Sequence, residues 1–169
     1  MKIYLDNVIA SGSVVSDLEP PEMAAVQKLI TAGKDGRLEV VTSRKSWDEQ
    51  SRASDLAKRS KLDEARQDIP VLTDDSRLLG ITTVHHEGMF ISYPILTGIV
   101  DEGLYATFVA AGLKDLDAQH LTDAVHNGCD RFVTTDNHFL KSRRATLEAA
   151  CRGLRIVKPS ELVAELGPA

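Results

Sequence analysis

The sequence predicts an α/β fold in which a mostly parallel sheet lies between two layers of helices. Short β-type runs alternate with amphipathic helical patterns along most of the chain. Acidic residues follow two of those runs closely, at the edge where parallel α/β sheets bind their ligands. The chain has 169 residues, 43% apolar and 27% charged, which is typical of one folded domain and excludes a disordered chain. We therefore expect residues 1–169 to form a single domain.

The first quarter of the chain contains two of the expected strands. A β-type run ends at Asp6, and Pro20-Pro21 is typical of the first turn of a helix. The segment between them contains Gly, Ser and Asp residues, which favour a loop. In order, the expected elements are a strand at 2–5, a loop at 8–19, a helix at 22–32 capped by Gly33, a strand at 38–42 and a charged amphipathic helix at 46–61.

The rest of the chain continues the alternation around a more β-like middle. Two β-type runs flank His85-His86-Glu87-Gly88, which indicates a hairpin. His85 and His86 are candidate metal ligands, but adjacent residues on a strand point to opposite faces, so a place in the turn at the hairpin tip is the better interpretation. In order, we expect a strand at 69–72, hairpin strands at 81–84 and 89–93, a helix at 104–111 closed by Gly112, a helix at 117–127 followed by Gly128, a strand at 131–134, a helix at 145–151, a strand at 154–157 and a helix at 160–166 with Ser160 as its N-cap.

Four carboxylates are expected at one edge of the sheet. Asp6 and Asp136 follow two strands, Asp117 begins a helix, and Glu49 lies early in the helix after the second strand. Carboxylates placed together raise one another's pKa values unless a cation neutralises them, and oxygen ligands suit Mg²⁺ or Mn²⁺. Such a site can activate water and stabilise a leaving phosphodiester oxygen. Taken singly, each acid is more typical of a cap or surface residue, and Asp117 alone is equally well explained as the N-cap of its helix.

Several segments resemble one family. Residues 117–139, DAQHLTDAVHNGCDRFVTTDNHF, resemble the C-terminal signature of PIN-domain nucleases, the family that contains the VapC-type toxins. KIYLDNVI is similar to the first motif of its YLDN-type branch, VVTSRKSWDE to the segment with the second acid, and VKPSELVAEL to the closing strand and helix. The resemblance implies a three-layer α/β/α PIN-like domain, in which we interpret residues 68–103 as an insertion that carries a β-hairpin.

The resemblance also implies roles for individual residues. Asp6, Asp117 and Asp136 would hold Mg²⁺ or Mn²⁺ and, with Glu49 as the second acid, form the catalytic set. Thr134 would orient Asp136 or the attacking water through its hydroxyl. The residues expected to contact substrate are Asn7, Arg44, Lys45, His138, Arg143 and Arg144, although His138 is more commonly explained as a plain surface histidine. His120 is interpreted as a packing residue beside the site, Asp123 as lying outside it, and Asp48 as the alternative to Glu49.

The leading hypothesis is a metal-dependent endoribonuclease that hydrolyses RNA phosphodiester bonds. The resemblance implies as partners an RNA substrate, a second copy in a homodimer and, for the toxin of a toxin–antitoxin pair, an antitoxin protein. The alternative is a PIN-like binding or scaffold module with weak catalysis, which the net charge of −5 favours because phosphate contacts need cations. A receiver-type phosphoacceptor domain ranks lower, because its central acid-bearing strand has no counterpart.

Nothing in the sequence points to a membrane or to secretion. The longest nearly apolar stretch, 88–100, is interrupted by Ser92, Pro94 and Thr97 and is too short for a membrane helix. The N-terminus lacks the apolar core of a signal peptide. Cys129 and Cys151 have no metal-ligand or disulfide-framework spacing. We therefore expect a cytoplasmic protein with buried, reduced cysteines.

Overall fold

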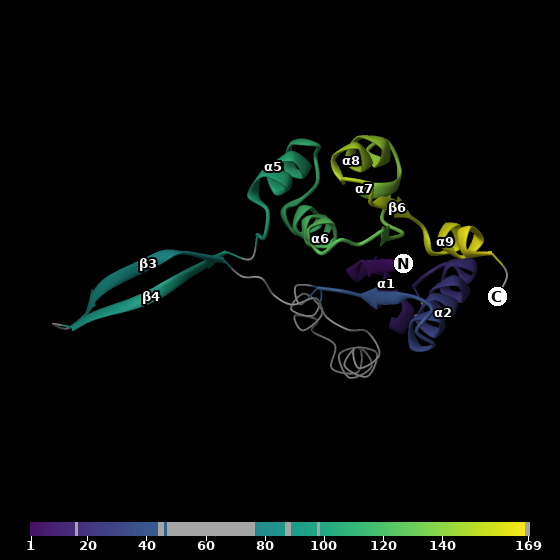
Figure 1. Cartoon of the computed structure of the whole chain (residues 1–169), viewed down its shortest axis with the longest axis horizontal. Helices are drawn as coiled ribbons and strands as arrows, with labels where there is room; N and C mark the ends of the chain where they lie inside the picture. Colours follow the sequence, from purple (N-terminus) through teal and green to yellow (C-terminus); the bar gives the residue numbers. More distant parts are fainter. Residues whose placement is uncertain (16, 44–45, 47–76, 87–88, 98, 168–169) are drawn as a thin grey trace.

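The computed structural model describes residues 1–15, 17–43, 46, 77–86, 89–97 and 99–167 (Figure 1). Two elements expected from the sequence, the helix at 46–61 beyond Ser46 and the strand at 69–72, lie outside the described residues. Four residues proposed for the site also lie outside them, namely Arg44, Lys45, Asp48 and Glu49.

A parallel sheet of four short strands forms the centre of the fold. Its order is β2 (Glu39–Val41), β1 (Lys2–Leu5), β5 (Arg131–Val133) and β6 (Arg155–Val157). Tyr4 on β1 pairs with Val41 on one side and with Phe132 on the other. All three ladders are parallel, so the carboxyl ends of the strands meet at one edge. The predicted α/β fold with a parallel sheet is confirmed.

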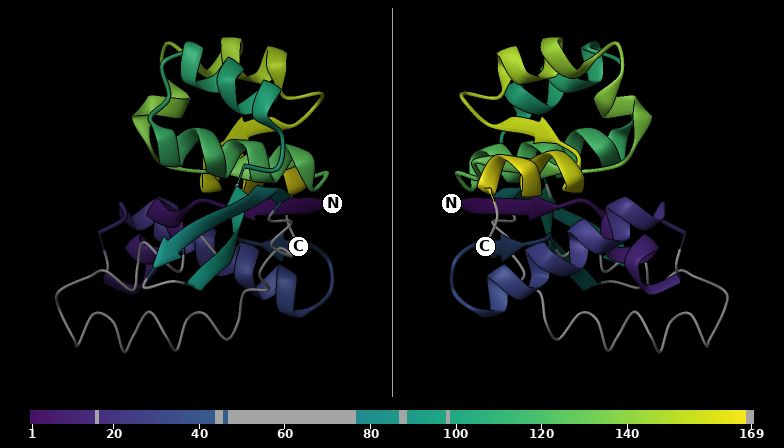
Figure 2. Two further views of the ribbon diagram at one scale, coloured as in Figure 1. Left: turned by 90° about the vertical axis from the view of Figure 1, so that its left-hand side faces the viewer. Right: turned by 90° about the vertical axis from the view of Figure 1, so that its right-hand side faces the viewer.

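Helices cover both faces of this sheet and make three layers (Figure 2). One layer contains α5 (Glu102–Ala110), α6 (Asp115–His126), α7 (Asn137–Leu140) and α8 (Arg144–Ala150). The other contains α1 (Asn7–Val15), α2 (Pro20–Lys34) and α9 (Pro159–Leu166). Burial on both sides explains why the strands are apolar at successive positions, as strands of parallel sheets usually are.

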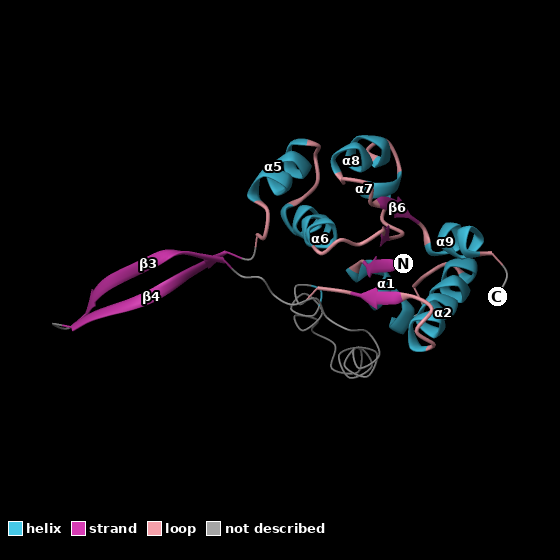
Figure 3. Ribbon diagram, viewed as in Figure 1, coloured by secondary structure: helices cyan, strands magenta, loops and turns pink. Residues whose placement is uncertain are grey.

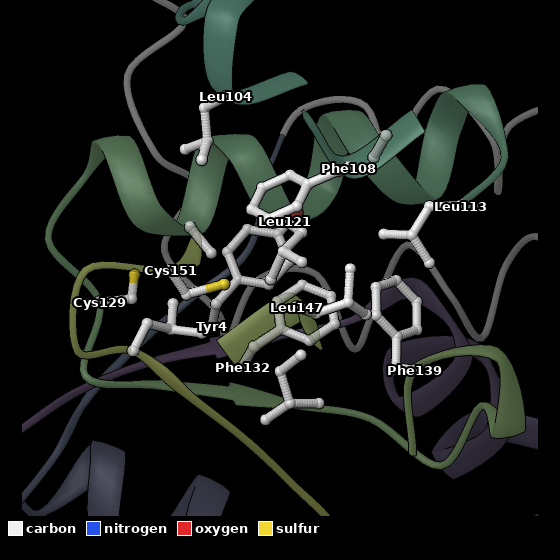
Figure 4. Packing of buried hydrophobic residues seen from close by; sticks show 14 of the residues in the cluster. Tyr4, Leu104, Phe108, Leu113, Leu121, Cys129, Phe132, Phe139, Leu147 and Cys151 are labelled. Atoms are coloured by element: carbon white, nitrogen blue, oxygen red, sulfur yellow. The ribbon is translucent and has the colours of Figure 1, made fainter. Parts of the chain in front are cut away.

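Successive residues of a strand belong to different cores, because side chains alternate between the faces of a sheet. Tyr4 and Phe132 lie in the core beneath α5, α6, α7 and α8. Figure 4 shows Phe132 in this core, stacked on Tyr4 with ring centroids 5.3 Å apart and tilted against Phe139 at 4.9 Å. Both cysteines lie in the same core, free and buried as predicted, and burial raises the pKa of each thiol to about 12.

The segment after the first strand is a helix, and the predicted loop at 8–19 is wrong over residues 8–15. Ile9 is fully buried in the second core, so helical packing outweighs the turn-forming residues. The hydroxyl of Ser11 donates to the carbonyl of Asn7 one turn earlier, at 2.8 Å, and so stays within the helix. A Cβ at Gly12 would lie 2.9 Å from Cγ of Leu18, so this glycine permits close packing.

Several predicted helix ends differ from the observed ones, and three of these differences involve a predicted cap. α2 continues past Gly33 to Lys34, and the positive φ falls on Gly36, at 72°. α6 begins at Asp115, so Asp117 lies inside its first turn and is not the N-cap. α9 begins at Pro159, and Ser160 is not its N-cap. Instead, the amide and the hydroxyl of Ser160 donate to the buried carboxylate of Glu22 on α2, at 3.0 and 2.6 Å.

The expected hairpin is present and longer than predicted. Its antiparallel strands β3 (Arg77–His86) and β4 (Met89–Thr97) extend away from the central sheet in Figure 3. His85 pairs with Phe90 and His86 with Met89, so the two histidines end a strand and the prediction that they form the turn is wrong. Among the described residues, no helix is long and apolar enough to cross a membrane.

Candidate metal centre at the carboxyl edge of the sheet

Two neighbouring parallel strands bring Asp6 and Thr134 together. Asp6 follows β1 and Thr134 follows β5, and the preceding residues Leu5 and Val133 pair in register. The Thr134 hydroxyl donates to Oδ2 of Asp6 at 2.6 Å across 128 positions of sequence. The same hydroxyl accepts from the backbone N–H of Asp136 at 3.0 Å. Thr134 therefore contacts the side chain of Asp6 and the backbone of Asp136. The resemblance implied that its hydroxyl orients Asp136 or the attacking water, and the contact with Asp6 was not expected.

Asp6 is a buried carboxylate with hydrogen bonds to both oxygens. It is 6% exposed, and its Oδ1 accepts from the backbone N–H of Asn7 at 2.7 Å. Burial raises the pKa of Asp6 to about 6, and the negative charge of Asp117 adds to this rise. His120, the Thr134 hydroxyl and the Asn7 amide act in the opposite direction. Asn7 is the first residue of α1, and its backbone N–H helps to hold the carboxylate of Asp6.

Asp117 reaches the same edge from the first turn of α6. Burial raises the pKa of Asp117, and the charge of Asp136 raises it further. His120, His138 and Lys114 oppose this rise. The charge of Asp117 therefore interacts with that of Asp6 and with that of Asp136. Negative charge at this edge is unfavourable without a cation.

Three side chains place possible ligand atoms close together. One carboxylate oxygen of Asp117, one of Asp136 and one ring nitrogen of His138 all lie within 4.8 Å of one another. Opposite ligands of an octahedral Mg²⁺ are about 4.2 Å apart, since each metal–oxygen bond is about 2.1 Å long. Small side-chain rotations would therefore let these three atoms share one divalent cation. Asp6 is not in this group of three, although the sequence assigned it to the metal.

His138 is the member of this group that sequence analysis missed as a ligand. Asp136 is the N-cap of the short helix α7, and its Oδ1 accepts from the backbone N–H of His138 at 2.8 Å. This turn brings Nδ1 of His138 to 3.3 Å from the same oxygen. One feature of the sequence could have indicated this ligand: a histidine follows, two residues later, an aspartate at the end of a strand. When that aspartate caps a helix, the chain folds back and brings the histidine close to its carboxylate.

A buried polar network lies beside the acids on α6. The phenol oxygen of Tyr4 is 2.8 Å from Nδ1 of His120, and Oγ of Ser43 is 3.2 Å from the same nitrogen. His120 is therefore a buried packing residue beside the site, as interpreted from the sequence. Asp123, also buried, adds to the raised pKa of Tyr4 and lies outside the group of three ligands, as expected.

Two of the arginines proposed to bind substrate, Arg143 and Arg144, lie among the described residues and have contacts within the protein. The guanidinium of Arg144 forms ion pairs with Glu148 at 3.4 Å and with Glu161 at 3.0 Å. Arg143 lies against Gly112, where a Cβ would be 3.1 Å from its Nε. Both residues belong to the segment that follows α7, so they are close in sequence to the acidic edge.

Comparisons with protein-family models, with curated proteins and with solved structures found no match to this chain. Its function therefore has to be argued from the chemistry of the site, because a fold alone does not determine function.

Proposed function

We propose that this protein is a Mg²⁺- or Mn²⁺-dependent endoribonuclease of the PIN-domain type. The observation that supports the proposal is the convergence of Asp6, Asp117 and Asp136 at the carboxyl edge of the parallel sheet, with ligand atoms of Asp117, Asp136 and His138 within 4.8 Å. Carboxylate ligands suit Mg²⁺ and Mn²⁺, the cations that commonly serve phosphodiester chemistry.

The residues of the site would have different roles in the reaction. Asp117 and Asp136 would hold the cation. A bound divalent cation supplies Lewis-acid stabilisation of phosphate oxygens and activates water. Asp6 would complete the acidic edge beside the cation, and in the metal-free protein burial raises its pKa to about 6. Thr134 would keep that carboxylate in place through its 2.6 Å hydrogen bond. This arrangement favours hydrolysis of a phosphodiester bond.

RNA as the substrate rests on the resemblance to PIN-domain nucleases. Among the described residues, Arg143 and Arg144, together with Asn7, are proposed to contact the RNA backbone. The same resemblance supports a toxin of a toxin–antitoxin pair that acts as a homodimer. The RNA substrate, the antitoxin and the second copy of the chain are therefore all part of the proposal.

A binding or scaffold module remains the second candidate. The net charge of −5 and the ion pairs of Arg144 with Glu148 and Glu161 favour it, because both weaken attraction to phosphate. The two functions differ in one respect that can be measured: a scaffold needs neither a divalent cation nor ionised acids at this edge.

The proposal is tested by incubating the purified protein with a panel of RNAs in Mn²⁺, in Mg²⁺ and in EDTA. We expect cleavage with a divalent cation, none in EDTA, and loss of cleavage by at least about a hundredfold in Asp117→Asn. Asp115→Asn is the matched control, because Asp115 lies in the same first turn of α6 but outside the group of possible ligands. This control should cleave like the wild type.

Calorimetry with Mn²⁺ completes the test. Cleavage that persists in EDTA, or that Asp115→Asn and Asp117→Asn reduce equally, would contradict the assigned site. Absence of both cleavage and Mn²⁺ binding would favour the scaffold module.

A further inference from the structure

We propose that His138 is a third ligand of the cation held by Asp117 and Asp136, and that it makes the site select Mn²⁺ over Mg²⁺. This inference rests on the proposed metal centre and adds to it a nitrogen ligand and a cation preference. It concerns a residue for which the sequence suggested only a contact with substrate or a place on the surface.

The backbone around Asp136 prepares this geometry. Oδ1 of Asp136 accepts from the N–H of His138 at 2.8 Å, which closes the first turn of α7 and directs the chain back toward the carboxylate. Nδ1 of His138 lies 3.3 Å from that same Oδ1. Adjacent ligands on an octahedral cation are roughly 3 Å apart when each bond is about 2.1 Å. The separation of these two atoms thus matches neighbouring positions on one ion.

Asp117 supplies the third position from a different element. Its carboxylate comes from α6, and one of its oxygens lies within 4.8 Å of the possible ligand atoms of Asp136 and His138. The side chain of His138 is 52% exposed, so its ring can turn to meet an ion from solvent. A ring nitrogen of His138 therefore lies near carboxylate oxygens from two separate segments, Asp136 at the start of α7 and Asp117 on α6.

The ligand set determines the expected cation. Mg²⁺ binds oxygen almost exclusively in proteins, whereas imidazole nitrogen suits first-row transition metals. Two carboxylates and one imidazole therefore favour Mn²⁺ over Mg²⁺. Replacing the imidazole by a carboxylate would remove this preference without removing the site.

The experiment compares Mn²⁺ and Mg²⁺ binding by calorimetry in four full-length proteins: the wild type, His138→Ala, His138→Asp and His126→Ala. His126 is an exposed histidine at the other end of α6 and serves as the control. We expect the wild type and His126→Ala to bind Mn²⁺ about tenfold or more tightly than Mg²⁺. His138→Ala should lose most of its Mn²⁺ affinity and keep its Mg²⁺ affinity within about threefold, and His138→Asp should favour Mg²⁺ relative to the wild type.

Pulsed electron paramagnetic resonance of the Mn²⁺-loaded protein adds a direct readout. A ligating imidazole nitrogen couples magnetically to Mn²⁺, so the coupling should be present in the wild type and absent in His138→Ala. Mn²⁺ binding that His138→Ala leaves unchanged, with no such coupling in the wild type, overturns the role of His138 and leaves the two-carboxylate centre intact. A wild type that binds neither cation overturns the metal centre itself.

Discussion

Replacing Asp6 by Asn changes how the stability of the metal-free protein depends on pH. The ordinary pKa of the aspartate is 3.8, and in the fold it is about 6 because the side chain is buried. Between these two pH values the folded protein holds a proton that the unfolded chain has released. Stability of the wild type therefore falls as pH rises from about 4 through about 6. The difference between the two pKa values corresponds to about 3 kcal/mol.

The amide of Asn cannot ionise, so Asp6→Asn removes this fall. The amide oxygen still accepts one hydrogen bond, from the hydroxyl of Thr134 or from the N–H of Asn7, and losing the other costs about 1 kcal/mol. We expect the variant to be about 1 kcal/mol less stable than the wild type at pH 4 and about 2 kcal/mol more stable at pH 7.5. In Tm, the change between the two pH values amounts to about 6–12 °C for a chain of this size.

The free energy of unfolding of both proteins is measured at several pH values by urea denaturation, followed by far-ultraviolet circular dichroism with EDTA present. Asp17→Asn is a suitable control, because Asp17 is exposed and lies after α1. If the free energy of unfolding depends on pH in the same way for Asp6→Asn and the wild type between pH 4 and 7, that result refutes the reasoning. Burial would then not oppose ionisation of Asp6.

Three further predictions concern the same edge and its support. Thr134→Val removes the hydroxyl that donates to Asp6 and accepts from a backbone N–H, so we expect a loss of roughly 2–3 kcal/mol at pH 7 by urea denaturation, while Thr134→Ser should lose far less. Gly33→Ala would place a Cβ 2.6 Å from Cγ2 of Val40 and should lose about 1–3 kcal/mol. Gly103→Ala on α5, whose Cβ would meet Oδ1 of Asp101 at an ordinary contact distance of 3.6 Å, should be neutral or more stable by up to about 1 kcal/mol. Saturating Mn²⁺, at about a hundred times its Kd, should stabilise the wild type by about 2.7 kcal/mol in thermal unfolding, and EDTA should reverse this; no shift would contradict the metal centre.

Local chemistry determined most of the secondary structure. The alternation of Ile3, Tyr4 and Leu5 between two cores is a direct result of strand geometry, and it was visible as an apolar run. The helical spacing of 22–32 predicted most of α2, and the aspartates after β1 and β5 predicted the acidic edge. These predictions succeeded because periodicity, strand ends and turn residues depend on neighbours in the chain.

Helix ends and the loop at 8–19 were predicted less well. Glycine is typical of a helix cap, which is why the sequence placed the end of the helix at Gly33. In the structure, the side chain of Val40 on β2 packs where a Cβ of Gly33 would be, so this glycine is explained by a contact with another element. Ile9 is buried beneath the sheet, so the segment around it is a helix despite its Gly and Ser residues. Propensity is a weak preference that tertiary packing overrides.

The assignment of individual roles depended on the tertiary structure. The sequence and its resemblance suggested Asp6, Thr134 and Asp136 as site residues, and the hydrogen bond from Thr134 to Asp6 joins positions 128 residues apart. His138 became a candidate ligand only when α7 and α6 placed its ring near Asp136 and Asp117. Sequence by itself determined which kinds of groups reach the edge, because side-chain chemistry and strand ends are local. Their pairing and their pKa values come from distances and burial, which exist only once distant segments have packed together.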